Sequence, residues 1–333
     1  RHEKYDVLKA TFRRDNPLSH EDAVWKHPVN GHELINVGRA FMGGTKPLYI
    51  FEDRQSPVIR DGRIAGYKQY LFKEAVNCVG FYKPEGALVT EAAAKLQDIL
   101  CGRYSIPTFS ATDSQGRVLG SFQERIDVMQ EGRVDLFAWQ AKPRDNLTDQ
   151  MKSEILREHA LDWLLCNFDT KGENFLHRTD GHLSSFDKEA SFGRLKDAGA
   201  AKMSTDYCPH ANDTLYNTFF TEFAQGRLTL DLSATLKQIK RMEAMSREDY
   251  LGLFTKMLDQ KYGSAGPKNK SRNKAEEAIY ARKANLREEY RRFYTELIQR
   301  RHKALRVKGE KEDCTAFLNS EKQFQFDDEP DKT

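Results

Sequence analysis

Apolar residues occur in short runs over the first part of the chain and adopt a helical period after about residue 130. Short apolar runs separated by glycine-containing turns are typical of antiparallel strands. One clear helix interrupts them from Thr90 to Leu100, where Thr90 can cap the first turn and the alanines favour the helix. The runs that predict strands are 34–37, 48–51, 67–73, 106–110 and 117–127.

A glycine-containing turn separates the first two predicted strands. Gly43 and Gly44 can adopt positive φ angles and let the backbone approach a ligand. The amides of this turn, together with Thr45 and Lys46, could cradle a triphosphate. The alternative is an ordinary hairpin, because the segment is neither a Walker A motif nor a complete Gly-x-Gly-x-x-Gly motif.

Three further residues of this region are candidates for nucleotide binding. Lys73 ends an aromatic strand, where it could grip phosphates or simply be solvated. Glu91 could form an ion pair with Lys73 or favour the helix dipole, and Glu85 is its rival for the ion pair. The backbone of a predicted hinge over residues 122–126, which includes Glu124, could read an adenine edge.

The stretch from residue 161 to 193 places polar residues directly beside apolar runs. Asp169, Asn174 and Asp187 each adjoin such a run. A charge close to a buried segment needs a partner. Mg²⁺ on a triphosphate is such a partner, because this ion is usually held by one or two carboxylates plus substrate phosphates. The alternative interpretation is a surface hairpin with solvated loop acids.

The spacing within this stretch predicts a specific chemistry. Asp169 and Asn174 form an Asp-x4-Asn pattern, the arrangement of a kinase catalytic loop in which the Asp accepts the hydroxyl proton and the Asn holds a metal. Asp187 follows where a metal-chelating Asp would fall, after a turn at residues 178–181 that fits a hairpin. We therefore predict Asp169 as the base, Asn174 and Asp187 as metal ligands, and Lys171 as a contact to the γ-phosphate.

Composition adds few constraints. A chain of 333 residues with 39% apolar residues suggests two domains or lobes, and its net charge of +3 identifies no partner. Its five cysteines are spread widely with no Cys-x2-Cys pair, which favours reduced thiols, no structural zinc and a cytoplasmic location. No apolar run approaches the roughly 18 residues of a membrane span.

The two ends of the chain differ from its centre. Residues 1–30 predict a solvated arm or an extension that packs on a lobe. Residues 274–305 predict one long helix with an apolar stripe, and residues 268–308 hold 14 Lys and Arg against 5 Glu. This basic helix could contact anionic lipid, an inositol phosphate or an acidic protein, or be a packed helix with a solvated basic face. We do not expect nucleic acid as its partner. Residues 309–333 are acidic and predict disorder.

Two segments of the central stretch resemble a known family. Residues 167–176 resemble the Asn-x-Asp-x4-Asn-x-Leu/Ile loop of the atypical branch of the protein-kinase-like fold, which includes phosphatidylinositol 3/4-kinases, actin-fragmin kinase and HipA-type toxin kinases. Residues 185–192 resemble the Ile-Asp-Asn-Gly-x-Ala-Phe element of type II phosphatidylinositol 4-kinases and actin-fragmin kinase. Lys188 and Glu189 depart from the Asp-Phe-Gly pattern, and no Ala-Pro-Glu follows, so we do not expect an ordinary eukaryotic protein kinase.

The resemblance implies a bilobal α+β fold. A small antiparallel β lobe with one helix would span residues 31–127, and a larger, mostly helical lobe residues 128–308. It also implies an ATP- and Mg²⁺-dependent phosphotransferase acting on a hydroxyl of a protein, an inositol or a phosphoinositide, with peripheral membrane contact open. Transfer of AMP, or a catalytically degenerate binding module, are the alternatives.

Overall fold

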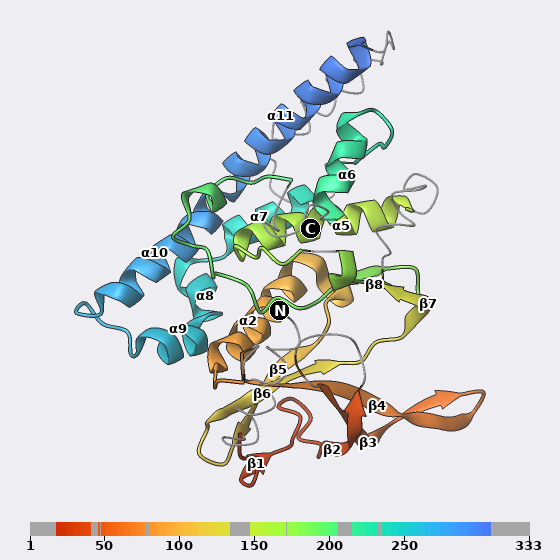
Figure 1. Cartoon of the computed structure of the whole chain (residues 1–333), viewed down its shortest axis with the longest axis vertical. Helices are drawn as coiled ribbons and strands as arrows, with labels where there is room; N and C mark the ends of the chain where they lie inside the picture. Colours follow the sequence, from red (N-terminus) through yellow and green to blue (C-terminus); the bar gives the residue numbers. More distant parts are fainter. Residues whose placement is uncertain are drawn as a thin grey trace, which may run out of the picture. The chain divides into compact units, whose positions relative to one another are not determined.

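The described part of the chain is a mixed α+β structure that divides into two compact units (Figure 1). The computed structural model describes residues 18–40, 46, 48–77, 80–133, 147–170, 172–205, 215–231 and 235–307. Unit 1 takes its described residues from Arg1–Lys95, Ile106–Ile126 and Leu253–Asn269, and unit 2 from Leu96–Ser105, Asp127–Gly252 and Lys270–Thr333.

Unit 1 is built on a six-stranded antiparallel sheet in the order β1-β5-β6-β4-β3-β2. It also holds most of α2 (Pro84–Cys101) and all of α9 (Thr255–Tyr262). Each run that predicted a strand overlaps an observed strand, and β1 is additional. They are β1 (Ala23–Val24), β2 (Ile35–Ala40), β3 (Leu48–Arg60), β4 (Arg63–Glu74), β5 (Thr108–Asp113) and β6 (Val118–Glu124).

Aromatic rings from alternate strand positions form the core of this sheet. Phe51, Phe72 and Phe122 are each about 1% exposed and pack edge to face or tilted against one another. Trp25, just after β1, lies with its ring centroid 5.0 Å from that of Phe51 and 5.2 Å from that of Phe72. The described part of the first 30 residues is therefore an extension that packs on unit 1 through Leu18, Ala23 and Trp25.

The hairpin between β3 and β4 is longer than predicted. The sequence indicates a turn over residues 62–66, but the turn is confined to Asp61 and Gly62, with φ angles of 51° and 73°. Two successive residues with positive φ give a turn whose twist matches that of the flanking strands, and Asp-Gly favours it. Arg63 therefore already pairs with Arg60 across the hairpin.

Helix α2 begins earlier than predicted. Pro84 provides the first helical residue, where its missing N–H costs nothing, so Thr90 and Glu91 lie in the helix interior. The hydroxyl of Thr90 donates to the carbonyl oxygen of Gly86 at 2.7 Å. The predicted cap at Thr90, and the placement of Glu91 in the first turn, are wrong for this reason.

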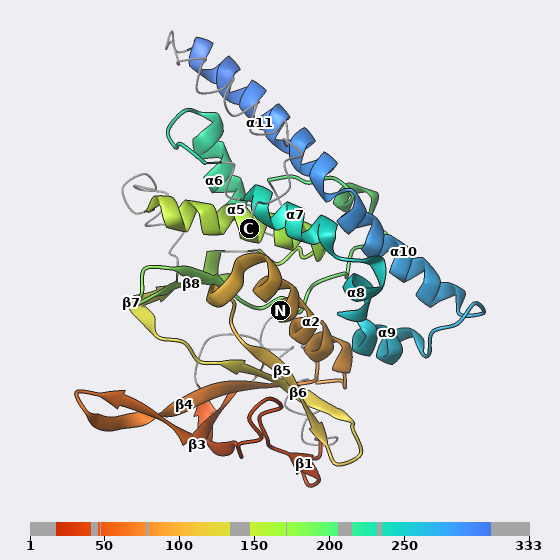
Figure 2. The same ribbon diagram turned by 180° about the vertical axis from the view of Figure 1, so that it is seen from behind.

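Unit 2 combines helices with a three-stranded antiparallel sheet in the order β7-β8-β9 (Figure 2). None of the described helices is long and apolar enough to cross a membrane. The elements of unit 2 are α5 (Asp149–Leu164), α6 (Leu215–Ala224), α7 (Leu236–Ala244), α8 (Arg247–Gly252), α10 (Lys270–Ala284), α11 (Leu286–Val307), β7 (Val128–Arg133), β8 (Phe175–Arg178) and β9 (Leu183–Ser185).

The predicted single basic helix is wrong, because α10 and α11 are separate helices with a break at Asn285. The Asn285 side chain donates to the carbonyl oxygen of Ala281 at 2.7 Å and shares it with the N–H of Asn285, at 3.0 Å. Such a local side-chain bond competes with the regular helical pattern. The apolar stripe predicted for the helix is confirmed as buried: Ile279, Leu286, Tyr290, Phe293, Leu297 and Ile298. Residues 308–333 lie outside the described residues.

Several basic residues of these helices serve packing. Arg282 is buried and donates to the carbonyl oxygens of Trp163 (2.7 Å) and Ala200 (2.9 Å). Arg301 is buried and donates to those of Phe223 (2.6 Å) and Leu228 (2.7 Å). Trp163 and Phe223 lie in the last turns of α5 and α6, where a cationic donor interacts favourably with the carbonyl end of the helix. The positive charge of α10 and α11 is therefore partly structural.

Burial of His159 on α5 makes the stability of unit 2 depend on pH. The ring lies among Tyr216, Phe220 and Phe293, and Nε2 donates to the carbonyl oxygen of Ser204 at 2.7 Å. Burial lowers the pKa of His159 to about 3. Below pH ~6.5, His159 therefore binds a proton in the unfolded chain but not in the folded chain. The free energy of unfolding falls as the pH decreases from that value.

We predict that His159→Gln, which can keep the bond to Ser204 but cannot titrate, flattens this dependence. Between pH 7 and pH 5, the free energy of unfolding of the unchanged protein should fall by about 2 kcal/mol more than that of the variant. Urea unfolding at the two pH values measures this difference. Equal losses in both proteins would show that His159 is not buried in its neutral form.

Candidate functional site

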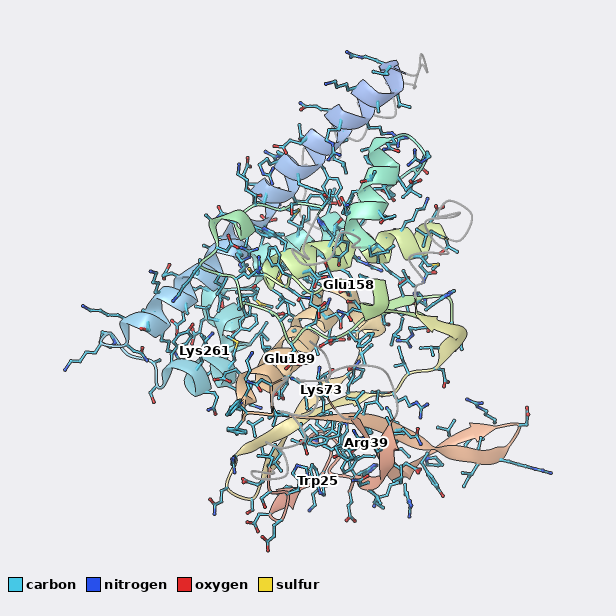
Figure 3. All side chains as sticks on the ribbon, in the orientation of Figure 1. Trp25, Arg39, Lys73, Glu158, Glu189 and Lys261 are labelled. Carbon is cyan, nitrogen blue, oxygen red and sulfur yellow. The ribbon has the colours of Figure 1, made fainter. Side chains whose placement is uncertain are left out.

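A row of buried acidic residues on α5 is the foundation of the candidate site. Glu154, Glu158 and Asp162 are spaced four residues apart, so they lie along one face of the helix, and each is at most 5% exposed. The helix begins at Thr148, whose side chain accepts from the N–H of Met151 at 3.1 Å. Figure 3 marks Glu158. Buried charges need partners. Each carboxylate therefore bonds a group from another segment, and that bond fixes the segment to α5.

Lys188 joins two of these carboxylates. Its Nζ lies 2.8 Å from Asp162 Oδ1 and 3.1 Å from Glu158 Oε2, and it donates to Ser185 Oγ at 2.7 Å. All three bonds are buried. Burial alone would lower the pKa of Lys188, but the Asp162 and Glu158 carboxylates outweigh it and raise the pKa above its usual value. The ammonium is therefore charged at neutral pH.

Neutral donors complete the partners of the two carboxylates. Glu158 Oε1 accepts from Gln97 Nε2 at 2.8 Å and from the Cys101 thiol at 3.3 Å. Asp162 accepts from Asn167 Nδ2 at 2.9 Å and from the Tyr216 hydroxyl at 2.5 Å. Burial, and then Glu158, raise the pKa of Cys101, which keeps it a thiol donor. One buried ammonium and four neutral donors thus hold two buried carboxylates.

The loop that carries Asp169 is fixed to this network at its start. Helix α5 ends at Leu164, and Cys166 turns the chain with a φ of 46°. Asn167 then bridges the network and the loop: Nδ2 donates to Asp162, and Oδ1 accepts from the N–H of Asp169 at 3.2 Å. The position of the Asp169 backbone thus depends on Asp162.

The predicted hairpin brings Asn174 beside the backbone of Asp169 and of Phe186, the residue before Asp187. Strands β8 and β9 pair Phe175 with Ser185, and the N–H of Phe186 donates to the carbonyl oxygen of Asn174 at 2.9 Å. The Asn174 side chain, 3% exposed, donates through Nδ2 to the Asp169 carbonyl oxygen at 2.8 Å. Asp187 directly follows Phe186. The three residues predicted to form the site are therefore neighbours in unit 2.

Backbone strain is concentrated around Asp187. Four non-glycine residues of the described chain have a positive φ, and three of them lie here: Cys166 (46°), Asp187 (61°) and Phe192 (62°). Such conformations cost about 1–3 kcal/mol each and persist only where the surroundings enforce them. Here Lys188 is held by α5, and the N–H of Phe192 donates to the Leu165 carbonyl oxygen at 2.8 Å.

The residues of unit 2 fit a magnesium-bound triphosphate in their chemistry. Because Asn174 uses Nδ2 to bond the Asp169 carbonyl oxygen, its amide oxygen Oδ1 is the atom that could ligate a hard cation. The carboxylate of Asp187, which directly follows the Phe186 bonded to Asn174, is the second candidate ligand. The Thr170 hydroxyl is buried with no hydrogen-bond partner among the described residues, which suits a phosphate oxygen. Within the described ranges, no three His, Cys, Asp or Glu residues gather as a metal cluster, so most remaining ligands would have to be phosphate oxygens or water.

The predicted nucleotide-binding residues of unit 1 have their own local partners. Lys73, labelled in Figure 3, lies on β4 with Leu48 and Ser121 as its partners on the neighbouring strands. Glu91 is buried, accepts from the Ser110 hydroxyl at 2.9 Å and lies 3.5 Å from Lys256 Nζ.

The predicted hinge residue Glu124 belongs to strand β6. Its N–H donates to the Pro107 carbonyl oxygen at 2.9 Å, and its carboxylate pairs with Lys68 at 3.2 Å. That amide is therefore already used within the sheet.

Four of the predicted site residues lie outside the part of the chain that the structure describes. They are Gly43, Gly44, Thr45 and Lys171. Lys46 is described as a bend ahead of β3, half-buried. The predicted phosphate cradle and the γ-phosphate contact stay predictions.

Sequence reasoning missed the residues that support the site. Glu158 and Asp162 are acidic residues in a helix whose other positions are largely buried, and their four-residue spacing was the available signal. Lys188 was read only as a departure from a family pattern. A lysine directly after a predicted metal ligand requires an acidic partner if it is buried, and α5 supplies two.

Comparison with known proteins adds no identity. No protein-family model matches the chain, and no curated protein matches its sequence.

We predict that Lys188→Met destabilises unit 2 by about 3–5 kcal/mol, because it leaves Glu158 and Asp162 buried without their cation. Urea unfolding measures the loss. Lys196→Met removes an exposed lysine from the same segment and should change stability by no more than about 0.5 kcal/mol. Adding Glu158→Gln to Lys188→Met should recover part of the loss. A cost below about 1 kcal/mol for Lys188→Met would contradict the buried ion-pair network.

Proposed function

We propose that this protein is an ATP- and Mg²⁺-dependent phosphotransferase that moves the γ-phosphate to a hydroxyl acceptor. The observation that carries the proposal is the meeting of Asp169, Asn174 and Asp187, joined by the bonds Asn174–Asp169 and Phe186–Asn174. Asp-x4-Asn with a following Asp is the residue set that such transfer uses for the base and the metal ligands.

Each residue has a distinct task in the proposal. The Asp169 carboxylate orients the acceptor hydroxyl and takes its proton while the hydroxyl oxygen bonds to the γ-phosphorus and the β–γ bridging oxygen leaves with ADP. Asn174 Oδ1 and the Asp187 carboxylate are the metal ligands. Mg²⁺, when bound, neutralises charge on the phosphates. Positioning and charge neutralisation dominate such transfers, so rigid supports are what the protein must supply.

The α5 network supports this role by fixing both ends of the site. Asn167 holds the backbone of Asp169, and Lys188 holds the backbone next to Asp187. These two residues bond to the same oxygen, Oδ1 of Asp162. We propose Asp162 and Lys188 as positioning residues, which act through Asp169 and Asp187.

The bound nucleotide and the transferred group are tested together. Purified protein is incubated with ATP labelled at the α- or γ-phosphate, with casein, actin, inositol or phosphatidylinositol vesicles as acceptors. Transfer of γ-label to any acceptor or to the protein itself supports the proposal. Transfer of α-label would identify AMP transfer, and nucleotide binding without any transfer would identify a binding module; either result overturns it.

We predict that Asp169→Asn lowers turnover by about 10²–10⁴-fold and leaves the affinity for Mg-ATP within about twofold, because the base acts only on the proton. Asp187→Asn should instead weaken Mg-ATP binding at least about tenfold, since a carboxylate ligand is lost. Fluorescence titration with a labelled ATP analogue, with and without EDTA, separates the two effects.

Asp180→Asn is the matched control for these variants. Asp180 lies in the exposed turn of the same hairpin, and its Oδ1 accepts from the N–H of His182 at 3.1 Å, a bond that Asn can keep. Turnover and affinity should both be unchanged. Normal turnover in Asp169→Asn would exclude this residue as the base, and unchanged Mg-ATP affinity in Asp187→Asn would exclude that ligand.

A further inference from the structure

The outer half of the β3–β4 hairpin, residues 54–68, extends beyond the strands that flank its base (Figures 1 and 2). Strand β2 pairs with β3 only as far as Glu52, and β6 pairs with β4 only from Tyr70. No other described strand pairs with residues 54–68. A two-stranded ribbon is marginally stable alone in water, and its unpaired edges are templates for another strand. We call residues 54–68 the distal ribbon.

The two faces of the distal ribbon differ in chemistry. Ile59 lies opposite Ile64, and these side chains are 57% and 61% exposed. Arg60 lies opposite Arg63, both exposed. Opposite residues share a face and successive residues alternate, so one face of the tip is apolar and the other is basic. The formal charge of the distal ribbon, residues 54–68, is +3, from three arginines and Lys68 against Asp61.

One edge of the distal ribbon is better suited to receive a strand. Along β3, the N–H of Gln55 is already bonded to Asp53 Oδ1 at 3.0 Å, Pro57 has no N–H, and the register shifts between Asp53 and Pro57. Along β4, residues 63–68 contain no proline, carry one extra residue, Ala65, against three on β3, and have no strand on their second side within the described chain. The β4 edge therefore presents the less interrupted row of backbone groups.

We propose that the β4 edge of the distal ribbon binds an extended peptide segment in which apolar and acidic residues alternate. Side chains of an added strand alternate between the two faces of the sheet. Its apolar residues would pack beside Ile64 on the apolar face, and its acidic residues would lie beside Arg63 on the basic face. Main-chain bonds would supply affinity, and this alternation would supply specificity, as in strand addition generally.

Two other occupants suit the ribbon less well. A second copy of this chain would bring another ribbon of charge +3 beside the first, and like charges side by side are unfavourable. An anionic bilayer approached tip-first would meet the Asp61 carboxylate first, and one approached by the apolar face would have both arginines on the opposite side. The inference does not depend on the proposed phosphotransfer.

The test is a fluorescence-anisotropy titration of the full chain with a labelled nine-residue peptide that alternates valine and glutamate. We expect Arg60→Glu with Arg63→Glu, and separately Ile59→Ser with Ile64→Ser, to weaken binding at least about tenfold. Lys303→Glu with Arg306→Glu, exposed on α11, makes the same change in net charge and should leave the affinity within about twofold. Urea unfolding of each variant verifies that it is folded.

Control ligands test the mode of binding. The same peptide with N-methyl groups on alternate residues keeps its side chains but cannot form a ladder, and it should lose binding. Tight binding of this peptide, equal weakening in the α11 control variant, or no peptide binding at all would overturn the proposal. Binding to phosphatidylserine vesicles that needs Ile59 and Ile64, without peptide binding, would also overturn it and identify the ribbon as a lipid contact.

Discussion

A single buried ammonium, that of Lys188, lies between the Glu158 and Asp162 carboxylates one helical turn apart on α5. Removing ions from water costs several kcal/mol each, so such an arrangement persists only if hydrogen bonds satisfy the remaining lone pairs. Gln97, Cys101, Asn167 and Tyr216 provide those bonds. A buried ion pair with this many hydrogen-bond partners has one favourable geometry. Its main effect is therefore to fix the positions of the segments it joins, more than to add to the free energy of unfolding.

This buried ion-pair network determines the backbone conformation on both sides of the candidate site. Asn167 accepts from the N–H of Asp169, and Lys188, which directly follows Asp187, is bonded to Asp162. The left-handed conformation of Asp187 is unfavourable by itself, so it requires support from neighbours. A site that must hold a metal and a phosphate within a fraction of an ångström needs such support from packed elements.

The sequence predicted the elements better than their limits. Alternation and glycine turns predicted the strands of unit 1. The Asp-x4-Asn pattern and the turn at residues 178–181 predicted that Asp169, Asn174 and Asp187 are neighbours. Both predictions rest on local signals. The break at Asn285 and the early start of α2 at Pro84 were missed, since both depend on single residues within favourable helical patterns. The Asp61-Gly62 dipeptide is a local signal for the observed two-residue turn.

The support of the site was not predictable in the same way. Acidic residues at positions 154, 158 and 162 are equally compatible with a solvated helix face. Only the fold shows that this face is buried and that Lys188, 26 residues beyond Asp162, returns to it. Long-range pairing of this kind leaves no periodicity in the chain. It can be suspected only when a buried charge is noticed to lack a local partner.

The most direct test of the central claim is a crystal structure with Mn²⁺ and a non-hydrolysable ATP analogue, in which anomalous scattering locates the metal. The account predicts a peak within about 2.5 Å of an Asp187 carboxylate oxygen and Asn174 Oδ1, with phosphate oxygens completing the ligands. A metal and nucleotide bound elsewhere, with Asn167 and Lys188 bonded to Asp162 as described here, would contradict it.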